Sequence, residues 1–182
     1  MYIKLIIIFA IFITSIKIGS LISKKYINRV VELQEFKSAL NIFKTKIKYT
    51  YEPIPDIFNE ISDKFKNNIS TLFKNTVIEM KTKSAGEAWD FCIENTNLNI
   101  EEEDKRILKN LSKLLGKTDK DGQINEIEVT EEFLDLQIKK AQEERQKNEK
   151  LYKTMGVICG IAFGIILIWK ELVTKNGYKF II

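Results

Sequence analysis

The chain has 182 residues, of which 45% are hydrophobic and 30% are charged, and its formal net charge is +4. It has no histidine and only two cysteines, Cys92 and Cys159, which excludes histidine-based nucleophilic triads and leaves no ligand set for a zinc site. The excess positive charge lies at the ends, because 24 basic and 24 acidic residues balance between Lys24 and Lys153. We therefore expect no nucleic acid partner, no enzymatic activity, no metal and no cofactor.

The N-terminal stretch MYIKLIIIFAIFITSIKIGSLISKK is strongly apolar, and residues 5–22 carry a single charge, Lys17. A run of this length predicts a transmembrane anchor over residues 1–23. A cleaved signal peptide and a buried core helix are the alternatives, but no convincing small-residue cleavage site precedes Lys24.

Beyond the anchor, the helical period continues without a break. An apolar face is formed by Leu33, Phe36, Leu40, Phe43 and Ile47. This helix is predicted to end near Tyr51, because Pro53 and Pro55 cannot continue it. An independent coiled-coil dimer is a weaker interpretation, since the repeat covers only about three heptads.

Shorter helices are predicted over residues 54–65, 72–80, 84–95 and 99–116 from their apolar spacing. The third begins with Ser84 and Glu87 in the pattern of a capping box. The fourth has acidic residues in its first turn and ends at Gly116, as helix dipole and capping preferences require.

The stretch KTDKDGQINEIE resembles a calcium loop, but Lys117 occupies the first ligand position, where a carboxylate is needed. We therefore interpret it as a polar turn in which Gly122 supplies backbone freedom. From Asn125 a last helix is predicted to run to the end of the second apolar segment. After Ala141 its apolar face disappears in QEERQKNEK, which is typical of either a solvated stalk or a docking site.

The stretch MGVICGIAFGIILIW, residues 155–169, predicts a C-terminal transmembrane helix over residues 154–173, followed by a short tail, 174–182. A buried soluble helix is the alternative. Gly156, Gly160 and Gly164 recur at four-residue steps and predict close packing against another membrane helix, with the first anchor as the nearest partner. The alternative is that lipid simply tolerates these glycines.

Basic residues gather on the inner side of both apolar segments, with Lys24, Lys25 and Arg29 after the first and six further cations between 139 and 153. The positive-inside rule therefore places residues 24–153 in the cytoplasm, with both chain tips across the membrane. Together these features predict an all-α protein: a bundle of about six helices tethered by a transmembrane helix at each end.

Several segments closely resemble the stage III sporulation protein AB family over nearly the whole chain. The resemblance rests on four stretches: EPIP with Pro53 and Pro55, EAWD with Ala88 and Trp89, LLGKTDKDGQ with Leu115 and Gly116, and LYK before the glycine-bearing segment. These six residues are candidates for the bundle core or family motif. The resemblance also implies a likeness to the cytoplasmic domains of type II secretion F proteins.

The resemblance implies a membrane protein on the mother-cell side, in the outer forespore membrane, within a channel between mother cell and forespore. Its implied partners are a secretion-type ATPase encoded in the same operon, the other channel components and membrane lipid, and a homo-oligomer is left open. We therefore expect a non-enzymatic platform or scaffold. A membrane-anchored regulatory adaptor or receptor, with a ligand-sensing bundle, is the alternative.

Overall fold

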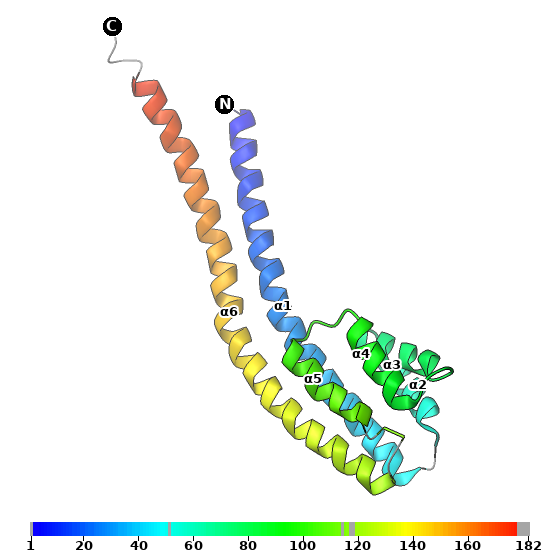
Figure 1. Cartoon of the computed structure of the whole chain (residues 1–182). Coiled ribbons are helices and arrows are strands. Elements are labelled where there is room, and N and C mark those ends of the chain that lie inside the picture. The colour runs from blue at the N-terminus through cyan, green and yellow to red at the C-terminus, as the bar shows by residue number, and fades with distance from the viewer. Residues whose placement is uncertain (1, 51, 114, 117–118, 178–182) are drawn as a thin grey trace. The chain divides into compact units, whose positions relative to one another are not determined.

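The structure is a computed structural model that describes residues 2–50, 52–113, 115–116 and 119–177 (Figure 1). The described residues form six α-helices and one short 3-10 helix. They are α1 (Tyr2–Tyr49), α2 (Ile54–Lys64), α3 (Asn68–Glu79), α4 (Ala85–Asn95), α5 (Glu102–Asn110), the 3-10 helix η1 (Leu111–Lys113) and α6 (Lys120–Gly177). The prediction of an all-α protein of about six helices is confirmed.

Two compact units divide the chain. The bundle unit comprises Asn28–Gln142, and the terminal unit comprises Met1–Ile27 together with Glu143–Ile182. The long helices α1 and α6 contribute to both units, whereas α2 to α5 belong to the bundle unit alone.

Aromatic side chains fill the centre of the bundle unit, one from each of its first four helices. Phe43, Phe58, Phe73 and Trp89 are each at most 2% exposed. Neighbouring rings pack edge-on or tilted, with centroids 5.0 Å apart for Phe43 and Phe58, 4.9 Å for Phe58 and Phe73, and 5.4 Å for Phe73 and Trp89. These are favourable geometries for aromatic pairs. The predicted apolar face of the first long helix is buried as expected, except that Ile47 is only half-buried.

Local capping explains where the short helices begin. The predicted capping box of α4 is confirmed, because Glu87 N–H donates to Ser84 Oγ and Ser84 N–H donates to the Glu87 carboxylate. The helix predicted from Asn99 begins later, since a second capping box between Glu101 and Asp104 sets the start of α5. That helix also ends earlier than predicted, at Asn110, and η1 follows it.

The interpretation of residues 117–124 as a polar turn is wrong for the part that the structure describes. Helix α6 begins at Lys120, because the Asp119 carboxylate accepts a hydrogen bond from Gly122 N–H at 2.9 Å and caps the first turn. Gly122 is therefore helical. The backbone freedom of glycine is used instead at Gly116, whose φ of 72° lies in the left-handed region. Lys117 and Thr118 lie outside the described residues.

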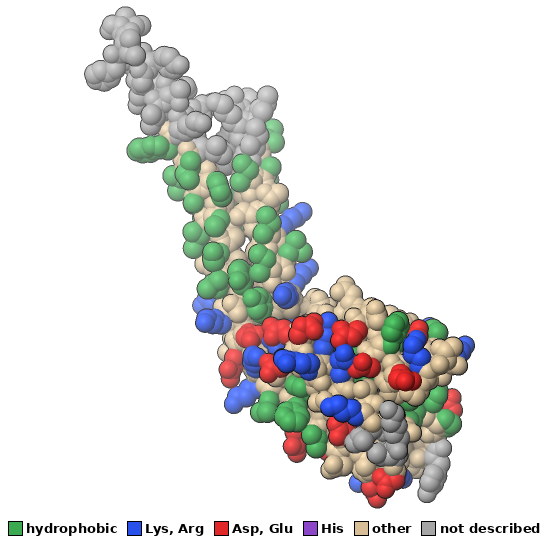
Figure 2. All heavy atoms as spheres, in the orientation of Figure 1, with side chains coloured by type: hydrophobic (Ala, Val, Ile, Leu, Met, Phe, Trp, Pro, Cys, Tyr) green, Lys and Arg blue, Asp and Glu red, His purple; other side chains and the backbone are tan. Residues whose placement is uncertain are grey.

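In the terminal unit, α1 and α6 pack through small residues, and large apolar side chains face outward (Figure 2). At least half exposed are Ile6, Phe9, Ile18, Leu21, Ile158, Ile161, Phe163, Ile165, Ile166 and Trp169. Among the described residues, no helix is long and apolar enough to cross a membrane. The two predicted transmembrane helices stay predictions.

Candidate functional site

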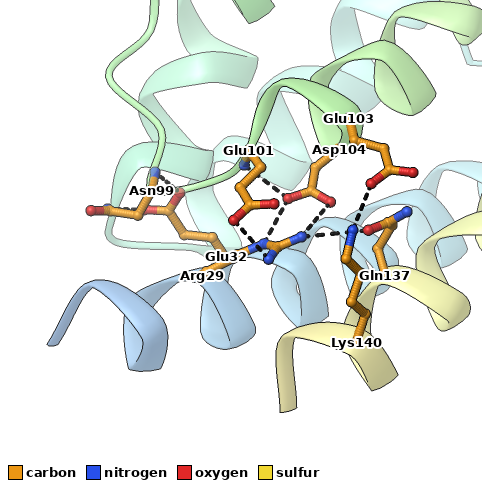
Figure 3. Close-up of polar contacts among 8 residues, drawn as sticks. All are labelled: Arg29, Glu32, Asn99, Glu101, Glu103, Asp104, Gln137 and Lys140. Carbon is orange, nitrogen blue, oxygen red and sulfur yellow. Dashed lines mark hydrogen bonds and ion pairs between the residues drawn. The ribbon is translucent and has the colours of Figure 1, made fainter. Parts of the chain in front are cut away.

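A group of charged and amide side chains, four of them buried, lies where α1, α5 and α6 meet in the bundle unit (Figure 3). We call it the polar cluster, and its members are Arg29, Glu32, Asn99, Glu101, Asp104 and Gln137. At its centre, Arg29 Nε donates to Asp104 Oδ2 at 2.9 Å and Arg29 Nη2 donates to Asp104 Oδ1 at 3.1 Å. Arg29 is 4% exposed and Asp104 is fully buried, so this two-point pair is largely withdrawn from water.

Neighbouring residues make further hydrogen bonds and an ion pair with Arg29 and Asp104. Arg29 Nη1 lies 3.1 Å from Glu101 Oε1, and Arg29 Nη2 donates to Gln137 Oε1 at 3.4 Å. The Asp104 carboxylate also accepts from Glu101 N–H at 2.9 Å as part of the α5 capping box. The Asp104 carboxylate therefore both caps the first turn of α5 and holds α5 against α1. The hydrogen bond from Arg29 to Gln137 connects α1 to α6 as well.

Glu32, one turn after Arg29 on α1, fixes the segment between α4 and α5. Its carboxylate accepts from Asn99 N–H and Asn99 Nδ2, both at 2.6 Å, and from Asn68 Nδ2 at 2.7 Å. Glu32 is only 4% exposed, and a buried carboxylate is tolerated where such donors replace water.

At the outer edge of the cluster, Lys140 Nζ donates to Glu103 Oε2 at 2.8 Å (Figure 3). The hydrogen bond from the Lys140 ammonium, helped by its charge, holds the pKa of Glu103 below its usual range. Elsewhere in the bundle unit, burial raises the pKa of the Cys92 thiol, so this cysteine is a poor nucleophile.

This arrangement holds α1, α5 and α6 against one another. Each charged centre is occupied by protein partners, and no group of three or more acidic or sulfur ligands that could hold a metal ion occurs among the described residues. A fully paired polar cluster of this kind fixes one relative arrangement of the helices around it.

The sequence-predicted motif residues lie outside the polar cluster, in the same bundle unit. Pro53 is the N-cap residue of α2 and Pro55 is in its first turn, while Ala88, Trp89 and Leu115 are buried. Trp89 Nε1 donates to the Leu108 carbonyl at 2.8 Å, which ties α4 to α5.

Gly116 links the motifs. A Cβ added there would touch Ala85, at the start of α4, at 3.5 Å and Ile54, between the two prolines, at 3.7 Å. The three motifs thus converge where α2 and α4 begin and η1 ends.

Two glycines of the second apolar segment, Gly156 and Gly160, face α1 within the terminal unit. A Cβ at Gly156 would lie 2.9 Å from the Ser15 carbonyl, and one at Gly160 would lie 2.6 Å from the Phe12 ring. Ser15 Oγ also donates to the Gly156 carbonyl at 2.8 Å. Gly164 is only half-buried.

The sequence alone does not reveal the contacts of three residues. Arg29 is only a topology signal in the sequence, and no local pattern connects it to Asp104, 75 positions away. Gly86 was passed over although a Cβ there would lie 2.1 Å from the Ser112 carbonyl; the glycine within the AGEAWD motif was the available signal. Gly19 is the partner of Gly156 across the helix pair, and it was visible as the one glycine in the first apolar segment.

Comparison with known proteins gives a consistent result. The sequence model of the family described as stage III sporulation protein AB matches residues 4–168. A relative described as stage III sporulation protein AB, from Bacillus subtilis (strain 168), is 24% identical over 153 residues, covering 82% of this chain and 90% of the relative. A solved structure of stage III sporulation protein AB (SpoIIIAB) is similar in fold, with a TM-score of 0.62 and 20% identity, over 66% of this chain and 98% of that chain. Since the family match spans almost the whole sequence, the chain belongs to the stage III sporulation protein AB family and has a role specific to sporulation.

Proposed function

We propose that the protein is a non-enzymatic membrane platform of a secretion-like channel between mother cell and forespore, with its bundle unit in the mother-cell cytoplasm. One observation carries the proposal. The helices α1 and α6 each run without interruption from a unit with an apolar outer surface into a unit whose surface is charged. A protein built in this way can hold a cytoplasmic bundle at a membrane.

Membrane anchoring is supported by the side chains of the terminal unit. Its outward residues include Phe9 and Leu21 on α1, both 65% exposed, and Trp169 on α6, 67% exposed. Its inner contact uses glycine and serine, as is common between helices in lipid. The basic residues that follow the first apolar segment and precede the second favour a cytoplasmic bundle unit.

Engagement of a cytoplasmic secretion ATPase follows from the likeness to type II secretion platforms, and it is part of the same proposal. The bundle unit suits such a contact because its charged side chains of both signs are interleaved on its surface (Figure 2). The alternative, a ligand-sensing adaptor, would need an enclosed polar pocket, whereas the bundle centre is filled by aromatic rings.

The test is a purification of the tagged full chain from membranes of sporulating cells. We expect the chain in the membrane fraction, and we expect the ATPase of the same operon to co-purify with it after mild solubilisation. An unrelated membrane protein with the same tag is the control. Recovery of the chain without membrane, or normal spore numbers after deletion of its gene, would refute the proposal.

A further inference from the structure

An apolar stripe lies on the outer face of α6 within the bundle unit. Phe133 is 47% exposed and Leu136 is 64% exposed, and Val129, one turn earlier, is 38% exposed. Their spacing of four and three residues keeps them within about 60° of one another around the helix. Large apolar side chains that line up in this way on a bundle are candidates for a contact with another helix.

Beside this stripe runs a groove of about 810 Å³ between α6 and α5. Ile107, Phe133 and Leu136 supply its apolar lining, and the opposite wall carries Arg106 on α5 and Lys113 on η1. The groove is open along the surface, so it suits side chains inserted from another helix.

The charges on the two sides of the stripe are opposite. The acids that line the groove already have cations, since Glu103 pairs with Lys140 at 2.8 Å and Asp90 lies 3.6 Å from Lys109. The groove is lined by three cations, Arg106, Lys109 and Lys113, and by two carboxylates, Asp90 and Glu103, so the side toward α5 carries more positive than negative charge.

The other side of the stripe is acidic. By helical spacing of about 100° per residue, Gln137 lies on the groove side of the stripe. Glu128, Glu132 and Lys139 lie on the opposite side, where the two carboxylates outnumber the one cation. Both glutamates are exposed, and Glu128 lies 3.8 Å from the Lys44 ammonium.

We propose that this face, with the stripe and both charged edges, binds the same face of a second copy of the chain, with the two α6 helices parallel. A two-fold axis along the helices brings the basic edge of one copy onto the acidic edge of the other, whereas an antiparallel pair would oppose like charges. Two contacts fix how α5 and η1 run alongside α6: Glu103 pairs with Lys140, and Leu111 lines a small pocket with Ile127. Arg106, which lies between Glu103 and Leu111 in the chain, is therefore at about the same level along the α6 axis as Glu132.

The parallel arrangement has a consequence for the membrane. Two copies with the same membrane topology have their α6 helices pointing in the same direction, as the parallel arrangement requires. Confinement to the membrane also raises the effective concentration of each copy around the other, which favours a contact of this modest size. The contact itself is argued from the bundle unit alone, so its failure would leave the proposed membrane platform untouched.

Disulfide formation between full-length chains in membranes tests the inference. In a chain with Cys159→Ser, we place a single exposed cysteine by Leu136→Cys, which lies near the two-fold axis, and compare it with Ile78→Cys on α3, which is 53% exposed. We expect a covalent dimer with Leu136→Cys under mild oxidation and little or none with Ile78→Cys. Equal yields from both positions, or cross-linking of Leu136→Cys to another protein only, would overturn the proposal.

A charge exchange tests the geometry. Arg106→Glu or Glu132→Arg alone should lower the dimer yield about tenfold. The two-fold axis creates two Arg106–Glu132 pairs in each dimer, and either change makes both pairs repulsive. The two changes combined in one chain should restore most of the yield. Lys74→Glu on α3, an exposed lysine away from the stripe, is the control. No loss with the single changes, or no recovery with the combination, would overturn the parallel arrangement.

Discussion

The bundle unit and the terminal unit contain the same two long helices but hold them together in different ways. In the bundle unit, large aromatic side chains and a buried arginine–aspartate pair separate and fix the helices. In the terminal unit, a Cβ on Gly19 would lie 2.5 Å from the Tyr152 carbonyl, so the backbones themselves are in contact. The first kind of packing is driven by removing apolar groups from water. The second needs only close van der Waals contact and works equally well in lipid.

The difference implies that the two units can be weakened separately. Loss of a buried charge or of a tight contact in the bundle unit should lower the free energy of unfolding of that unit. A larger side chain at a glycine of the terminal unit should instead separate α1 from α6 there and leave the bundle intact. Trp89 fluorescence reports on the bundle unit, provided that Trp169, the other tryptophan, is replaced by phenylalanine.

The largest effect is expected from Asp104→Ala. This change removes the carboxylate that Arg29 contacts at two points in its buried position and also removes half of the α5 capping box. Breaking a buried ion pair in this way typically costs about 3–5 kcal/mol. The free energy of unfolding, measured by denaturant titration of Trp89 fluorescence, should fall by that amount.

A double change provides the control. Arg29→Met combined with Asp104→Leu removes both charges, so it should lose much less stability than Asp104→Ala alone. A double variant as unstable as the single variant would mean that packing volume, rather than the ion pair, matters at this position.

The second effect concerns the close approach of α4 and η1. Gly86→Ala would bring a methyl group within 2.1 Å of the Ser112 carbonyl, so the backbone must shift. Overpacking of this kind costs about 1–3 kcal/mol. Gly122→Ala, in the first turn of α6, is the matched control and should change the stability by less than about 0.5 kcal/mol. An equal loss of stability in Gly86→Ala and Gly122→Ala would contradict the close contact between Gly86 and the Ser112 carbonyl.

The third effect lies in the terminal unit. Gly19→Leu should force α1 away from α6, because the new side chain would collide with backbone atoms of Tyr152 and Gly156. Spin labels at the exposed positions Ile18 and Val157, next to the two glycines, should report a longer and broader distance distribution. The bundle unit, followed by Trp89 fluorescence, should be unaffected. Gly164→Leu should have a smaller effect on the labels, since Gly164 is only half-buried.

Local signals in the sequence predicted more of the fold than of the sites. The Ser84–Glu87 capping box and the burial of Leu33, Phe36 and Leu40 depend on neighbours within a few residues, and both were predicted correctly. The start of α6 was misplaced because an aspartate three residues before a glycine suits a turn as well as a helix cap. Asp119 takes the second role.

The contacts of the sites depend on residues far apart in the chain. Arg29 and Asp104 are 75 positions apart, and Gly86 is necessary only because the Ser112 carbonyl approaches it from another element. Neither residue is unusual in its own segment, so periodicity and spacing carry no signal for the contact. The glycines of the second apolar segment were recognisable because their repeat is local, although their partner Gly19 was not.

The smallest effect is expected from Glu103→Gln at the surface of the polar cluster. Because Lys140 lowers the pKa of Glu103 in the folded chain, the ionised carboxylate stabilises the bundle unit above the pKa of the unfolded chain. That contribution is lost as the pH falls through the lower pKa of the folded state. The wild-type chain should therefore have a slightly higher denaturation midpoint than Glu103→Gln at pH 7, and the difference should disappear in strongly acidic buffer. Lys140→Met should remove the same difference at pH 7, because the carboxylate then has lost the ammonium that stabilises its charged form. A difference between wild type and Glu103→Gln that persists at low pH would assign the effect to the amide side chain rather than to the ion pair.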